Sequence, residues 1–370
     1  MTDHGLGYRA AENGAAVCSR PHRRFLGVSG RSPREMLNGL LSNRPPPPLQ
    51  GGPDGTWKGS AVYSTLLTDK GRIITDLRIL RDAKDGFLLD LPSDGFEGAV
   101  AHFRKFLPPR LAKVEDRSEG FGQITVLGPE AGGMLSEFLA TCGWALSPGE
   151  LADLAEGDEI GVTLPSSPNR EEGRVGAATE GDGSRTPETV RVMGNGETAH
   201  PGFDLLLSPY RAEEARRRLA RSGAAPLGEA DLETLRIENG RPAFGKDLTE
   251  ETIPLEAGIQ DRAIDNEKGC YAGQEVIIRI RDRGHVNKKF RGILLGDIPA
   301  PASGEELFLP GKEKSVGWIT SAVGSPAFGQ AIALGYLRRG VEPGDDVRVG
   351  GPDGLPGQVR ALSDRGWVLD

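Results

Sequence analysis

The chain has 370 residues, and its 45 Lys and Arg against 53 Asp and Glu give a net charge of -8, which argues against a protein that coats nucleic acid non-specifically. No run reaches the roughly 18 apolar residues of a membrane helix, so we expect a soluble, cytoplasmic protein of about two or three units. The few cysteines lie far apart, and no spacing of Cys and His suits zinc; this argues against both a disulfide framework and a bound metal. Residues 1–20 lack the apolar stretch of a signal peptide and are interpreted as a disordered tail.

The N-terminal half is predicted to alternate strands with short helices, which favours an α+β layer over a parallel doubly wound sheet. The turn Thr68–Gly71 ends on a glycine that can supply the backbone angle a hairpin needs. In chain order the expected elements are a helix that begins at Ser32 and Pro33, strands at 61–67, 72–80 and 86–91, a helix at 94–106 and a strand at 123–127.

The amino-acid composition of the second half changes twice along the chain. Residues 166–202 are polar and rich in Gly, Pro and Glu, and we interpret them as a loop insertion. After Gly292, short apolar runs recur between Gly and Pro, which predicts a small β-barrel or sandwich. The expected units are therefore a tail at 1–20, an α+β module of two lobes at 21–285, and a β-barrel domain at 286–370.

The segment Lys268–Glu275, with the sequence KGCYAGQE, holds the most chemistry. Cys270 lies between two glycines, which can turn the thiol outward, and a cysteine reacts as its thiolate. Lys268 would stabilise that anion. Cys18 and Cys142 are interpreted as inert, because the first lies in the tail and the second among apolar residues.

The following stretch, 276–295, is interpreted as a strongly basic hairpin, because Ile278 and Ile280 alternate with Arg279 and Arg281. A basic face beside a thiol suits an anionic ligand such as a polyglutamyl tail, a phosphate or a nucleic-acid backbone. A charged edge strand that deters aggregation explains the pattern equally well.

The segment KGCYAGQE resembles the signature of the YgfZ family, which includes mitochondrial iron–sulfur assembly factors. The stretches Leu235–Gly240, Gly245–Leu248 and Pro254–Glu256 resemble the segment that YgfZ proteins share with aminomethyltransferase T proteins. The hairpin at Leu67–Leu80 and the C-terminal barrel resemble theirs as well. The resemblance covers roughly residues 25–362, apart from the insertion.

The resemblance implies a clover-leaf of lobes around a folate pocket, followed by the β-barrel. In T proteins a glutamate at the position of Glu238 contacts the pteridine ring, and a carboxylate can accept paired hydrogen bonds from a pterin. Arg279 and Arg281 are then candidates to hold the folate tail. T proteins also carry an aspartate that assists one-carbon transfer after the third strand. Neither Asp90 nor Asp94 has the expected context, which argues against aminomethyl transfer.

The main functional hypothesis is therefore a folate-binding protein that assists assembly or repair of iron–sulfur enzymes through Cys270, with tetrahydrofolate bound. One cysteine cannot hold a stable cluster, so contact with iron–sulfur proteins or assembly machinery would be transient. The alternative is a tetrahydrofolate-dependent aminomethyltransferase or a one-carbon transferase that modifies tRNA. A thiol-dependent hydrolase would need His285 beside Cys270, and no acidic residue is evident to orient that histidine.

Overall fold

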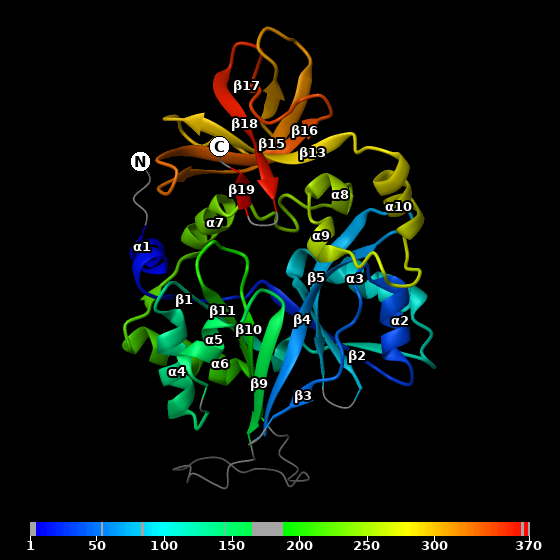
Figure 1. Ribbon diagram of the computed structural model, residues 1–370, viewed down its shortest axis with the longest axis vertical. Helices are drawn as coiled ribbons and strands as arrows, with labels where there is room; N and C mark the ends of the chain where they lie inside the picture. Colours follow the sequence, from blue (N-terminus) through cyan, green and yellow to red (C-terminus); the bar gives the residue numbers. More distant parts are fainter. Residues whose placement is uncertain are drawn as a thin grey trace, which may run out of the picture.

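The computed structural model describes residues 5–52, 55–82, 85–144, 146–164, 188–363 and 366–368. Figure 1 shows two lobes side by side below a β-barrel. The first lobe is blue and cyan, and the second is mostly green but also contains the blue N-terminal segment. The fold is thus a mixed α and β structure, as the sequence predicts.

A curled sheet runs through both lobes. Its neighbouring strands pair antiparallel, apart from the parallel contact of β12 with β1. The lobes join where β4 pairs with β9, from Thr56 opposite Val162 to Ser60 opposite Asp158. In spatial order the strands are β12 (Ala225–Pro226), β1 (Ala16–Ser19), β8 (Gly122–Leu127), β11 (Gly202–Leu207), β10 (Glu188–Gly194), β9 (Asp158–Leu164), β4 (Thr56–Leu67), β5 (Ile73–Arg81), β6 (Phe87–Pro92), β2 (Arg23–Ser29) and β7 (Lys113–Asp116), with β3 (Gln50–Gly51) beside β4.

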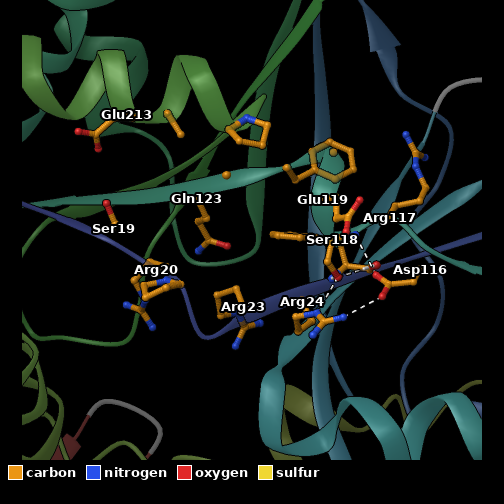
Figure 2. A pocket seen from close by; sticks show the side chains of 17 residues that line it. Ser19, Arg20, Arg23, Arg24, Asp116, Arg117, Ser118, Glu119, Gln123 and Glu213 are labelled. Atoms are coloured by element: carbon orange, nitrogen blue, oxygen red, sulfur yellow. Dashed lines mark hydrogen bonds and ion pairs between the residues drawn. The ribbon is translucent and has the colours of Figure 1, made fainter.

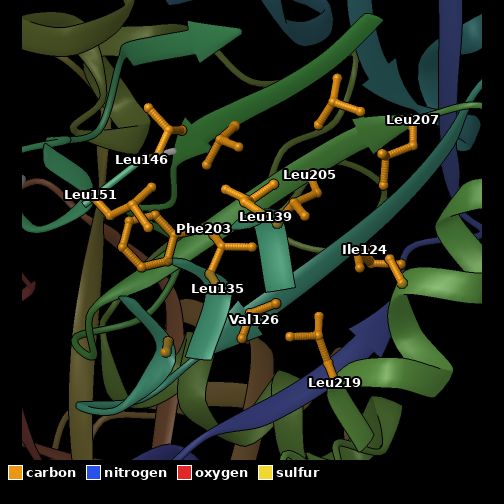
Figure 3. Close-up of a cluster of buried hydrophobic side chains, with 14 of the residues drawn as sticks. Ile124, Val126, Leu135, Leu139, Leu146, Leu151, Phe203, Leu205, Leu207 and Leu219 are labelled. Carbon is orange, nitrogen blue, oxygen red and sulfur yellow. The ribbon is translucent and has the colours of Figure 1, made fainter. Parts of the chain in front are cut away.

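Helices cover the outer face of each lobe. In the first lobe, α2 (Pro33–Leu40) and α3 (Ser93–Phe106) contribute to one apolar core, and Phe96, Ala99 and Phe103 give α3 its buried stripe. In the second lobe, α4 (Ala131–Thr141), α5 (Pro148–Ala152) and α6 (Pro209–Arg221) contribute to the core shown in Figure 3. Complete burial of one such leucine contributes about 1.5–3 kcal/mol.

Alternation along the strands gives the sheet a polar inner face. In β8, Ile124 and Val126 point into the core of the second lobe, so Gln123 and Thr125 point to the opposite side. The same reasoning places polar side chains of β4, β5, β6 and β11 between the lobes. This inner face holds the candidate site.

The linking helices α7 (Glu229–Glu238), α8 (Pro254–Ala257), α9 (Gln260–Ala263) and α10 (Gln274–Arg283) connect the lobes to the barrel. The barrel closes because β18 pairs back with β13, and its interior is apolar. Its strands in order are β13 (Lys288–Gly296), β16 (Gln330–Arg338), β15 (Ser315–Ser325), β14 (Glu306–Phe308), β17 (Asp346–Val349) and β18 (Leu355–Ser363), with β19 (Gly366–Val368) on β18.

Two expectations are wrong. The tail at 1–20 contains α1 (Leu6–Asn13) and β1, which pairs with β8 and β12. Tyr8 on α1 is buried in an apolar cluster with Leu227 and Leu235. Residues 1–4 lie outside the described part. Of the insertion at 166–202, residues 166–187 also lie outside it, whereas 188–194 form β10.

The prediction of a basic hairpin at 276–295 is also wrong, because the first half of this segment is α10 and only its second half is a strand. Gly273 precedes the helix with a positive φ of 81°, and a Cβ there would lie 2.5 Å from the carbonyl oxygen of Thr68. Close packing against the β4–β5 turn therefore fixes where α10 begins. Ile277 is buried, Ile278 is 37% exposed and Ile280 is half-buried, so the more buried isoleucines are three residues apart, as on one face of a helix.

Candidate functional site

Asp76 and Tyr63 form a hydrogen-bonded pair on the inner face of the sheet. Tyr63 on β4 donates from Oη to Oδ2 of Asp76 on β5, at 2.9 Å. The other oxygen, Oδ1, is buried and has no hydrogen-bond partner among the described residues. Burial raises the pKa of the Asp76 carboxyl. A desolvated carboxylate with an open acceptor is a strong candidate for chemistry or binding.

Two arginines flank this pair. The Arg262 guanidinium lies over the Tyr63 ring, 4.1 Å from its centroid, and pairs with Glu156 at 3.0 Å. The positive charges of Arg23 and Arg262 oppose the effect of burial on the pKa of Asp76. We call Arg23, Tyr63, Asp76 and Arg262 the central cluster.

Two neighbouring carboxylates have their oxygens occupied. Asp90 accepts from Arg23 at 2.7 Å and from Arg78 at 2.8 Å, and Arg78 also donates to Asp204 at 2.6 Å. The second oxygen of Asp204 accepts from Thr125 at 2.6 Å. Burial alone would raise the pKa of Asp204, but Arg78 and Arg20 lower it to about 2. Arg78 thus ties β5 of the first lobe to β11 of the second, and of these three carboxylates only Asp76 has an open oxygen.

Two arginines of the central cluster each line a pocket. Arg23 lines an open pocket of about 860 Å³ at the turn from β1 to β2, shown in Figure 2. Arg262 lines a smaller pocket of about 60 Å³ beside the barrel, with Arg241, Lys289 and Arg291 among its other walls. Both arginines also act on the charge of Asp76 and favour its ionised form.

The predicted thiol lies elsewhere, in the loop before α10. Cys270 is exposed. Lys268 is buried, and its Nζ donates to the carbonyl oxygens of Leu41 at 2.5 Å and Asn43 at 3.1 Å. Burial lowers the pKa of Lys268 to about 8. Lys268 thus anchors the loop to the backbone after α2, and no contact in the described part joins its ammonium to the thiol. The reactivity of Cys270 stays a prediction.

The residues predicted to bind folate are not gathered around Asp76. Glu238 accepts from Tyr8 Oη at 2.8 Å, from Ser325 Oγ and from the Ala327 amide at 3.2 Å, so it joins α1 to the barrel. Arg281 donates to Asn266 at 2.6 Å and to Asp282 at 2.7 Å, and Arg279 is exposed on the same helix. Their roles toward folate also stay predictions.

The sequence does contain a sign of the central cluster. Asp76 and Arg78 interrupt the apolar run from Ile73 to Leu80, which pairs on both sides in the sheet. Charged side chains inside such a strand must find partners or serve a site. Within the described residues, no group of three metal-ligating side chains occurs, and no helix is long and apolar enough to span a membrane.

Comparisons with known proteins agree on one family. Residues 288–359 match the model of the glycine cleavage T-protein C-terminal barrel domain. An aminomethyltransferase of Rubrobacter xylanophilus is 30% identical over 292 residues, which cover 79% of this chain and 70% of that protein. One of Corynebacterium jeikeium is 26% identical over 336 residues, which cover 90% and 81%.

A solved structure supports the same fold. The glycine cleavage system aminomethyltransferase T of Bartonella henselae aligns with a TM-score of 0.75 at 19% identity, over 98% of this chain and 90% of that one. Together with the relatives and the barrel match, this shows that the chain belongs to the aminomethyltransferase family of glycine cleavage T-proteins.

Proposed function

We propose that the protein is a tetrahydrofolate-dependent aminomethyltransferase in which Asp76 is the catalytic carboxylate. The observation that carries the proposal is the buried, unpartnered Oδ1 of Asp76, with its raised pKa. The family supports the aminomethyl chemistry, since the relatives bear that name. This reverses the order of the two hypotheses from the sequence, because the relatives' names and the site geometry offer no support for iron–sulfur assembly.

The side chains at the centre fit a folate. A reduced pterin presents a row of N–H donors, and an ionised carboxylate with a free oxygen is the matching acceptor. Asp90 and Asp204 are already saturated by Arg23, Arg78 and Thr125, so Asp76 is the acceptor that this group of carboxylates leaves available.

The reaction asks one thing of the protein beyond binding. Transfer moves the methylene of an aminomethyl donor, X–CH2–NH2, onto two acceptor N–H groups, and releases X–H and ammonia. A proton must leave each acceptor nitrogen. Asp76 can take such a proton at Oδ1, while Tyr63 holds Oδ2 and fixes the carboxyl plane. Its raised pKa improves it as a base, because catalytic bases work best near the operating pH.

Titration calorimetry with tetrahydrofolate tests the binding half of the proposal. Asp76→Asn should weaken binding by roughly ten- to a hundredfold, because it removes a charged acceptor. Asp94→Asn is the matched control, because Asp94 is exposed and is one of the two aspartates, with Asp90, that were considered from the sequence. Glu238→Ala belongs in the same series, as a test of the prediction from the sequence. Wild-type protein that is folded and gives no heat would remove folate from the proposal.

A second candidate function rests on the exposed thiol of Cys270 in the YgfZ-like segment. A role in iron–sulfur assembly predicts that cluster-dependent enzymes lose activity in a deletion strain and that Cys270→Ser fails to restore it. Full rescue by Cys270→Ser would dismiss this candidate. The hydrolase reading is weaker still, because His285 Nε2 lies 2.6 Å from Arg339.

A further inference from the structure

Glu156, in the loop between α5 and β9, binds two arginines at once. Its Oε1 accepts from Arg262 at 3.0 Å, and its Oε2 accepts from Arg241 at 2.7 Å. Arg262 lies on α9 and Arg241 follows α7, so one carboxylate of the second lobe holds two of the linking segments. A carboxylate between two guanidinium groups also offsets their mutual repulsion.

Two glycines leave the space that this carboxylate occupies. A Cβ at Gly194 would lie 2.1 Å from the carbonyl oxygen of Ala155, and a Cβ at Gly196 would lie 2.2 Å from Oε2 of Glu156. Glu156 also forms a parallel bridge with Gly194, and Asp158 accepts from the amide of Ala155 at 3.1 Å. The loop is thus fixed against the end of β10, and this fixes Glu156 where it meets the arginines.

The ion pair with Glu156 holds Arg262 over the ring of Tyr63. The guanidinium lies 4.1 Å from the ring centroid, and Tyr63 in turn donates to Asp76 at 2.9 Å. A long side chain loses much rotamer freedom in one such position, so a partner that holds its charged end matters. Burial and the charge of Asp76 raise the pKa of Tyr63, and Arg262 opposes them, whereas Glu156 raises it further.

From these contacts we propose that Glu156 is a positioning residue for the reaction: it holds Arg262 over Tyr63, where the guanidinium charge supports the Asp76 carboxylate. This inference rests on the proposed function and adds no second binding site. In the described contacts Glu156 bonds the two arginines and not Asp76, so it acts on the carboxylate through Arg262.

A different role for Glu156 would have the opposite sign. If Glu156 holds Arg262 in place, its loss lets the positive charge move away, and the pKa of Asp76 rises. If Glu156 only cancelled the charge of Arg262, its loss would strengthen that charge, and the pKa of Asp76 would fall. The direction of the change therefore separates the two roles.

A carbon-13 NMR titration of protein labelled at the aspartate carboxyl carbons measures the ionisation of Asp76 without any substrate. The signal of Asp76 is the one that Asp76→Asn lacks. Glu156→Gln keeps the shape of the side chain and removes its charge, and we expect it to raise the pKa of Asp76 by about 0.5–1 pH units. Gly196→Ala displaces the carboxylate without removing its charge, and it should raise this pKa as well.

Glu213→Gln is the matched control. Glu213 is 41% exposed, against 37% for Glu156, and it also binds two arginines, Arg216 and Arg217 on α6. The pKa of Asp76 should be the same in this variant as in wild type. Turnover gives a second readout, because the rise of kcat with pH should move to higher pH in Glu156→Gln by the same amount as the pKa.

An unchanged or lower pKa of Asp76 in folded Glu156→Gln, or an unchanged one in folded Gly196→Ala, would overturn the positioning role. Failure of the proposed function gives a different result. In that case Asp76→Asn turns over like wild type, while Glu156→Gln still raises the pKa of Asp76.

Discussion

The central cluster and the Cys270 loop place their reactive groups in opposite environments. Asp76 lies between two lobes, where burial raises its pKa and one oxygen has no partner. Cys270 is exposed to water. The buried Lys268, two residues before it, donates its ammonium hydrogens to backbone carbonyls and not to the thiol. The difference teaches that removal from water, more than the density of reactive residue types, prepares a group for proton transfer.

The largest expected effect comes from the pairs that hold the centre together. Arg78→Met leaves Asp90 and Asp204 buried and short of a cation, and removal of one partner of a buried pair costs about 3–5 kcal/mol. Urea unfolding should show this loss. In the exposed region, Arg279→Met should change the free energy of unfolding by less than about 0.5 kcal/mol. Equal losses of unfolding free energy in the two variants would mean that the ion pairs of Arg78 do not hold the two lobes together.

Opposite pKa shifts at the centre predict opposite pH effects. The pKa of Asp204 is lowered to about 2, so its stabilising contribution is present above its ordinary value and is lost as pH falls through about 2. Its size is on the order of 2 kcal/mol. The pKa of Asp76 is raised, so its contribution is present below its ordinary value and is lost as pH rises through the folded-state pKa.

The measurement is unfolding as a function of pH for two variants. Asp76→Asn should be as stable as wild type or more stable at neutral pH, because it removes a desolvated charge. Asp204→Asn should be less stable at neutral pH and should converge with wild type in strong acid. A less stable Asp76→Asn at neutral pH would show that Tyr63 and the two arginines stabilise the carboxylate by more than its burial costs, which would contradict this expectation.

Much of this architecture could be predicted from the sequence. The hairpin around Thr68–Gly71, helix α3 and the barrel strands follow from alternation and turn residues, because these patterns are local. The N-terminal strand β1 could not be predicted, because its order depends on pairing with β8 and β12, far away in sequence. Helix α10 was missed because isoleucines and arginines in alternation fit a strand as well as a helix.

The site was missed for a different reason. Cys270 attracts attention through its glycine-rich setting, whereas Asp76 is a single aspartate inside a strand. Its importance arises from burial, from Tyr63 and from two arginines on other elements. Tyr63 lies on the other strand of the predicted hairpin, but Arg23 and Arg262 are far away in sequence. Only the folded chain brings these arginines to Asp76.

The smallest expected effect concerns the thiols. Native alkylation read by mass spectrometry should label Cys270 first, the half-buried Cys142 later and Cys18 last. Burial raises the pKa of the Cys18 thiol to about 11, although the charge of Arg20 opposes it, so little thiolate is present. Cys270→Ser should leave stability within about 0.5 kcal/mol of wild type. Labelling of Cys142 ahead of Cys270 would contradict the exposed setting of the loop.

Turnover by Asp76→Asn tests the central claim most directly. The assay follows ammonia released from an aminomethylated carrier in the presence of tetrahydrofolate, with Asp94→Asn as the control. If Asp76 takes the proton, kcat should fall by about a hundred- to ten-thousandfold in Asp76→Asn and stay unchanged in Asp94→Asn. Wild-type turnover should also rise with pH as the Asp76 carboxyl ionises, above its ordinary pKa of 3.8. A folded Asp76→Asn variant with the kcat of wild type would contradict the account.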